Sequence, residues 1–133
     1  MWKSKLQQEI SLSTLHAEYV ALSQAVREFL PLKELVKEIL NEYKFETRNV
    51  KFYTHSTIFE DNLGTLTVAK SPRFTPTSKF IAVKYHWFRQ HATGENRAFD
   101  LKHIKSELQV ADIFTKGIQG VKFLELRKLL CGW

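Results

Sequence analysis

The chain has 133 residues, 44% of them hydrophobic, which is enough for one domain with a real core and too short for two. Twenty Lys and Arg residues against fourteen Asp and Glu residues give a net charge of +6, which favours a polyanionic partner. No apolar run approaches the ~20 residues that cross a bilayer, and the single Cys131 excludes an internal disulfide. We therefore expect a single domain, 1–133, with no membrane association, in a reducing intracellular compartment, the cytoplasm or the nucleus.

The first third of the chain predicts an edge strand followed by a long helical region. Residues 2–10 are mixed and partly alternating, as in a short edge strand. Ser13 is a suitable N-cap, and the helical pattern continues to Leu40 through apolar residues that include Leu15, Tyr19, Leu22, Val26 and Phe29. Pro31 lacks an amide hydrogen and crowds the preceding turn, so we expect it to kink or split this helical region.

The middle of the chain alternates between strand and helix patterns. Residues 50–54 and 57–59 are aromatic and β-branched, as half-buried strands require. Residues 62–69 predict a helix that ends before the Ser-Pro and Thr-Pro pairs which follow it. Another helix is expected over 81–91, and its aromatic residues fit core packing better than base stacking.

The last third predicts one more strand and two helices. Residues 98–104 alternate in the manner of a strand, with Phe99 and Leu101 against two charged residues. Ser106 can cap a short helix that runs to Lys116, and a final helix carries Val121, Leu124, Leu129 and Leu130. The order of these elements predicts an α/β fold in which a sheet is flanked by helices.

Three carboxylates stand within apolar patterns, where a charge needs a partner. Taken singly, each has an ordinary explanation. Glu18 can reach solvent or pair with a lysine, Asp61 can cap the helix that follows it, and Asp112 can be a solvated helix residue.

The segments that hold these residues are 11–23, 60–72 and 110–117. In this order and at these separations they resemble the RNase H domain at the end of copia-type LTR retrotransposon polyproteins. The resemblance extends from Trp2 to the last helix. It implies an RNase H-like mixed sheet flanked by helices, and cleavage of the RNA strand of an RNA–DNA hybrid.

The same resemblance implies that Glu18, Asp61 and Asp112 are the catalytic and metal-ligating residues, with Mg²⁺ or Mn²⁺ as the cofactor. Two-metal hydrolysis needs oxygen ligands that hold ions ~3.5–4 Å apart, and carboxylates suit Mg²⁺. An alternative alignment places the strand-end position at His55. We prefer Asp61, because its spacing to the segment 69–72 matches the family pattern without a gap.

The chain also departs from the family pattern. The family has a further Asp on a first strand upstream of Trp2, so we expect a sheet that lacks its N-terminal strand or strands and one metal ligand. Phe80 and Ala82 stand where the family has a His and an Asp. Metal binding and hydrolysis are therefore expected to be weak or absent, and an open sheet edge is expected to allow self-association. The alternative function is a domesticated, non-catalytic RNase H-like module that binds protein or nucleic acid.

Overall fold

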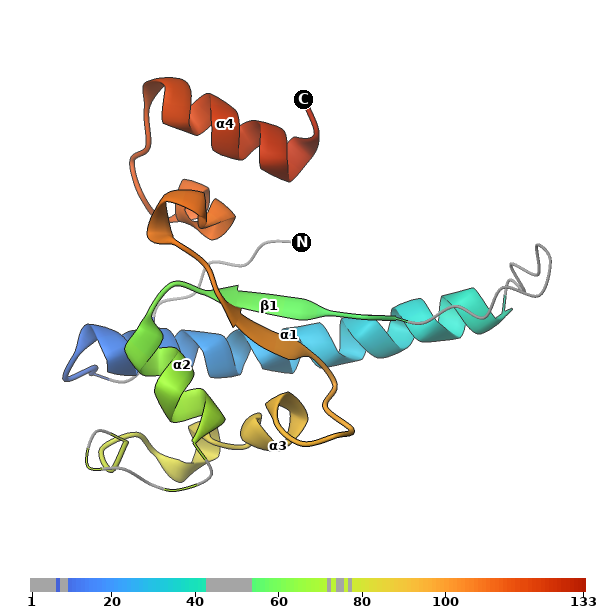
Figure 1. Cartoon of the computed structure of the whole chain (residues 1–133), viewed down its shortest axis with the longest axis vertical. Coiled ribbons are helices and arrows are strands. Elements are labelled where there is room, and N and C mark those ends of the chain that lie inside the picture. Colours follow the sequence, from blue (N-terminus) through green and yellow to red (C-terminus); the bar gives the residue numbers. More distant parts are fainter. Residues whose placement is uncertain (1–6, 8–9, 43–53, 72, 74–75, 77) are drawn as a thin grey trace.

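A computed structural model describes residues 7, 10–42, 54–71, 73, 76 and 78–133 (Figure 1). The predicted strands at 2–10 and 50–54 lie almost entirely outside these residues. In chain order the elements are α1 (Thr14–Glu42), β1 (Thr57–Glu60), α2 (Leu63–Lys70), η1 (Val83–Tyr85), α3 (Arg89–Ala92), β2 (Asp100–His103), η2 (Ser106–Leu108), η3 (Val110–Phe114) and α4 (Gly120–Cys131), where η marks a 3₁₀ helix. This order confirms the expected mixture of helix and strand.

Helix α1 is continuous over 29 residues and passes through Pro31. Its start agrees with the sequence, because the amide of His16 donates to the Ser13 hydroxyl at 3.2 Å. The prediction that Pro31 splits the helical region is wrong. Pro31 is exposed, so water can bind the carbonyl that the missing amide leaves without a partner.

Strands β1 and β2 are parallel and pair from Thr57–Asp100 to Glu60–His103. The pairing continues past both ends, since Asp100 N donates to the Ser56 carbonyl at 2.8 Å and Ile104 N donates to the Glu60 carbonyl at 3.1 Å. Parallel neighbours need a crossover connection, and α2, η1 and α3 supply it. Within the described residues the sheet has these two strands.

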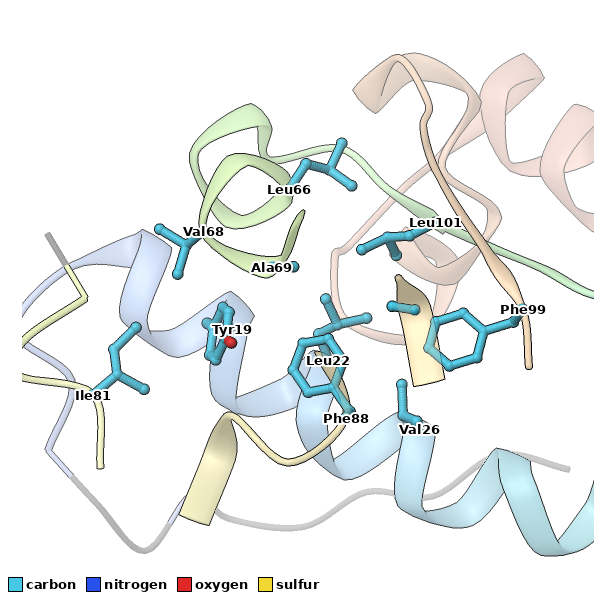
Figure 2. Packing of buried hydrophobic residues seen from close by; sticks show 11 residues of the cluster. Tyr19, Leu22, Val26, Leu66, Val68, Ala69, Ile81, Phe88, Phe99 and Leu101 are labelled. Carbon is cyan, nitrogen blue, oxygen red and sulfur yellow. The ribbon is translucent and has the colours of Figure 1, made fainter. Parts of the chain in front are cut away.

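The core lies between α1, α2 and the helix-facing side of the sheet (Figure 2). It contains Tyr19, Leu22 and Val26 of α1, Leu66, Val68 and Ala69 of α2, and Ile81, Phe88, Ala92, Phe99 and Leu101. The burial of Phe99 and Leu101 confirms the alternation expected for this strand. Phe88 is fully buried, which confirms core packing over base stacking for that residue.

Two predicted helices are broken in the structure. The expected helix at 81–91 is divided into η1 and α3, because His86 bonds Tyr19 of α1 at 2.8 Å while Phe88 enters the same core. Residues two apart do not share a helix face, so one regular helix cannot bury both. The expected helix at 106–116 is also replaced, by η2 and η3, with an extended Gln109 between them.

Helix α4 lies at the end of the molecule away from α3 (Figure 1). Its existence was expected, and it carries the four apolar residues that the sequence assigned to it. Leu126 is its buried residue, whereas Val121, Leu124, Leu129 and Leu130 are exposed. Among the described elements, α4 packs chiefly against η3.

Candidate carboxylate site

Four carboxylates from α1, from the end of β1 and from η3 are coupled through their charges: Glu18 with Asp61 and Asp112, and Glu60 with Glu18 and Asp61. Glu18 lies in the second turn of α1, Glu60 ends β1, Asp61 follows it, and Asp112 lies in η3. We call these four residues the carboxylate cluster. Burial raises the pKa of Glu18, the charge of Asp61 raises it further, and Asp112 adds a smaller increase that the charge of Lys116 opposes. Glu18 therefore lies within range of the charges of both other carboxylates singled out in the sequence, Asp61 and Asp112.

The packing of α2 on α1 positions Asp61 near Glu18. The Thr65 hydroxyl donates to the Leu15 carbonyl at 3.3 Å. A Cβ atom on Gly64 would lie 2.7 Å from Leu15 Cδ1, so the glycine permits this close approach. The turn after β1 is thereby held against the first turn of α1, three residues before Glu18.

The cap of α2 is Asn62 and not Asp61. Thr65 N donates to the Asn62 side-chain oxygen at 3.0 Å. The interpretation of Asp61 as a helix N-cap is therefore wrong, and its carboxylate is not used at that position.

Glu60 is the member of the cluster that the sequence interpretation missed. Its side chain points inward, and the residue is only 6% exposed. Burial raises the pKa of Glu60 to about 7, with a smaller contribution from the charges of Glu18 and Asp61, although the Asn62 amide opposes the shift by donating to Oε1 at 3.0 Å. The strand pattern could have indicated this position. Side chains two residues apart on a strand lie on the same face, so Glu60 lies on the same face as Ile58, which packs against the core.

Asp112 is paired with a cation. Lys116 Nζ lies 2.7 Å from Asp112 Oδ2, and the Asp112 side chain is 16% exposed. The hydrogen bond to Asp112 raises the pKa of Lys116, and the charges of Asp112, Asp61 and Glu18 add to the effect. The simple description of Asp112 as a solvated helix residue is thus incomplete, since Lys116 brings a positive charge into the cluster.

The donor atoms of the cluster suit Mg²⁺, which prefers carboxylate oxygens. Even so, in the part of the chain that the structure describes, no three His, Cys, Asp or Glu residues are arranged to hold a metal ion. Binding a divalent cation would require the carboxylates to converge and the Lys116 ammonium to leave Asp112.

His55, the alternative to Asp61, lies at the other end of β1. His55 Nε2 is 3.2 Å from Asp100 Oδ2, and Arg97 also pairs with Asp100. The structure therefore brings Asp61, and not His55, close to Glu18. Phe80 and Ala82, the two departures from the family pattern, are both exposed.

Comparison with known proteins gives this geometry a context. Over 132 residues, 98% of its length, the chain is 30% identical to the retrovirus-related Pol polyprotein from transposon TNT 1-94 of Nicotiana tabacum. The homologues of this chain are retrovirus-related Pol polyproteins of plant copia-type transposons. Those from transposons RE2 and RE1 of Arabidopsis thaliana are 26% and 25% identical over 122 residues, 92% of the chain.

The chain spans 8–9% of the length of these Pol polyproteins. No protein-family model matches it, and no solved structure does. No helix within the described ranges has both the length and the hydropathy needed to span a membrane.

Proposed function

We propose that this chain is the RNase H-like part of a retrotransposon Pol polyprotein, with an ancestral activity of metal-dependent cleavage of RNA in RNA–DNA hybrids. The observation that carries the proposal is the electrostatic coupling of Glu18 with Asp61 and Asp112. These residues come from α1, from the turn after β1 and from η3, in a chain whose homologues are Pol polyproteins.

In this proposal Glu18, Asp61 and Asp112 hold Mg²⁺ or Mn²⁺. The bound metal would supply an activated water and would stabilise the departing oxygen. Mutual repulsion favours cation binding, because a divalent ion relieves the cost of keeping several carboxylates ionised together. The net charge of +6 supports a nucleic-acid substrate.

Activity of this chain is expected to be weak or absent. Lys116 already pairs with Asp112, so a metal ion has to displace an ammonium group before it can use that carboxylate. The same ion pair favours the second candidate function, a domesticated module that binds nucleic acid or protein without hydrolysis.

A Mg²⁺ titration followed by NMR separates the two functions. For the first, we expect the amide signals of Asp61 and Asp112 to shift at millimolar Mg²⁺ and to shift less in Glu18→Gln. A matched control is Glu34→Gln, which removes an exposed carboxylate from the far half of α1. Signals that do not respond to Mg²⁺ would exclude the metal site and favour the non-catalytic module.

Cleavage of a labelled RNA–DNA hybrid tests the chemistry directly. We expect slow Mg²⁺-dependent cleavage at most, lost in Glu18→Gln and retained in Glu34→Gln. Rapid cleavage that Asp112→Asn abolishes would contradict the expected weakness, whereas cleavage that survives Glu18→Gln would contradict the assigned site.

A further inference from the structure

An open groove of about 460 Å³ lies between the end of α2, the segment after α3, and β2. Each of these three parts contributes one cation to its lining: Lys70 from α2, Arg97 from the segment before β2, and Lys102 from β2 itself. These residues are far apart in the sequence, so only the fold brings their charges together. We call this the basic groove.

One carboxylate, Asp100, also lines the basic groove. It pairs with Arg97 and with His55, and Lys102 Nζ lies 3.9 Å from it. The hydrogen bond from Arg97 lowers the pKa of Asp100, so this carboxylate is ionised at neutral pH. It orients Arg97 and offsets one positive charge. Three cations against one carboxylate leave the basic groove positively charged.

The turn after α3 leaves the wall of the basic groove open. Gly94 has φ +85°, and no atom lies within 4 Å of the position that its Cβ would occupy. A left-handed backbone of this kind favours glycine. Because Gly94 has no side chain, a ligand in the groove can approach the backbone closely at this position.

The helix dipole gives a structural reason for the position of one of the three cations, but not for the positions of the other two. Lys70 lies in the last turn of α2, where a positive charge stabilises the helix dipole. Arg97 and Lys102 lie outside the helices and have no such role.

We propose that the basic groove binds phosphate groups, either those of a nucleic-acid backbone or free phosphate. Lys70 and Lys102 supply charge, and Arg97 supplies a planar donor that matches phosphate oxygens. The groove begins beside the first residue of β2, whereas Asp61 follows the last residue of β1. It is therefore separate from the carboxylate cluster, and the proposal does not depend on metal binding or hydrolysis.

The test compares two double variants of the whole chain with equal loss of charge. Lys70→Gln with Lys102→Gln removes two cations from the basic groove. Lys105→Gln with Lys128→Gln removes two exposed lysines that do not line it. Binding of a single-stranded DNA oligonucleotide is measured by fluorescence anisotropy in EDTA, over a range of salt concentrations.

The groove variant is expected to bind the oligonucleotide about tenfold more weakly, and the slope of log K against log salt should fall by roughly one for each lysine that contacts phosphate. The control should lose much less. If the two variants lose the same amount of affinity for the oligonucleotide, the basic groove is not the site that binds the nucleic-acid backbone. Equal melting temperatures for the two variants would show that the loss of affinity does not arise because Lys70→Gln destabilises the end of α2.

A second arm identifies the source of the phosphate. Titration with inorganic phosphate, followed by NMR, should shift the amide signals of Gly94 and Lys102. If inorganic phosphate shifts them and the oligonucleotide does not, the ligand is free phosphate. If neither does, or if an oligoglutamate peptide binds more tightly than the oligonucleotide, the proposal is wrong.

Discussion

Glu60 is a carboxylate at an inward-facing position of a short strand, where an apolar side chain would pack without desolvation cost. Its neutral form is favoured in the folded chain, because burial raises the pKa of Glu60 from 4.5 to about 7. The unfolded chain releases this proton near pH 4.5, while the folded chain keeps it until about pH 7. The folded state thus binds more protons between these values, and its stability falls as the pH rises through this window.

We therefore predict that Glu60→Gln stabilises the chain at pH 8 by roughly 1–3 kcal/mol and has little effect at pH 4. Glutamine resembles the protonated acid and keeps an acceptor for the Asn62 amide. Urea unfolding at both pH values measures the change, with Glu125→Gln on α4 as an exposed control. A Glu60→Gln effect that is the same at pH 4 and pH 8 would contradict the raised pKa.

At the residue scale, the sequence predicted most about positions governed by local chemistry. The Ser13 cap and the inward-facing Phe99 and Leu101 follow from short-range rules. The meeting of Glu18 with Asp61 and Asp112 depends on tertiary packing, so family resemblance was needed to suggest it. The Lys116–Asp112 pair is an i,i+4 contact that helical spacing could have indicated, even though the segment folds as η3.

At the element scale, the contact between α1 and α2 determines where the carboxylate cluster forms. Gly64 leaves room for Leu15, and a β-branched residue at position 64 would have to displace the Leu15 side chain from the contact between these helices. We predict that Gly64→Val destabilises the chain by about 1–3 kcal/mol, from overpacking that outweighs the gain in helix propensity. Leu63→Val is the control, since Leu63 is exposed on the same helix. Thermal unfolding measures both, and equal melting temperatures for the two variants would show that the close approach is unimportant.

The elements that the sequence predicted poorly are those shaped by contacts from elsewhere in the chain. Residues 81–91 have a helical pattern, yet the bond between His86 and Tyr19 of α1 breaks the helix. The apolar residues Val121, Leu124, Leu129 and Leu130 of α4 are exposed, because the described elements do not cover them. Periodicity shows that a side chain is suited to burial, but it cannot show that a partner surface is present.

At the scale of the whole molecule, the described part of the sheet has only two strands and exposes apolar surface. Two strands seldom form a stable sheet without further pairing or cover. Ser56 and Glu60 direct their carbonyls to β2, so the alternate residues Thr57 and Phe59 turn their peptide groups to the other edge of β1. The Phe59 side chain is 50% exposed.

We predict that this edge of β1 mediates self-association of the chain. A second copy that pairs there would satisfy strand peptide groups and cover Phe59. Sedimentation velocity at increasing concentration should show a growing dimer fraction, which Phe59→Lys should reduce because a lysine protects an edge strand from pairing. Leu63→Lys is the matched control, because Leu63 is 63% exposed but lies in α2. A chain that stays monomeric throughout, or two variants that reduce the dimer equally, would show that β1 is not the interface.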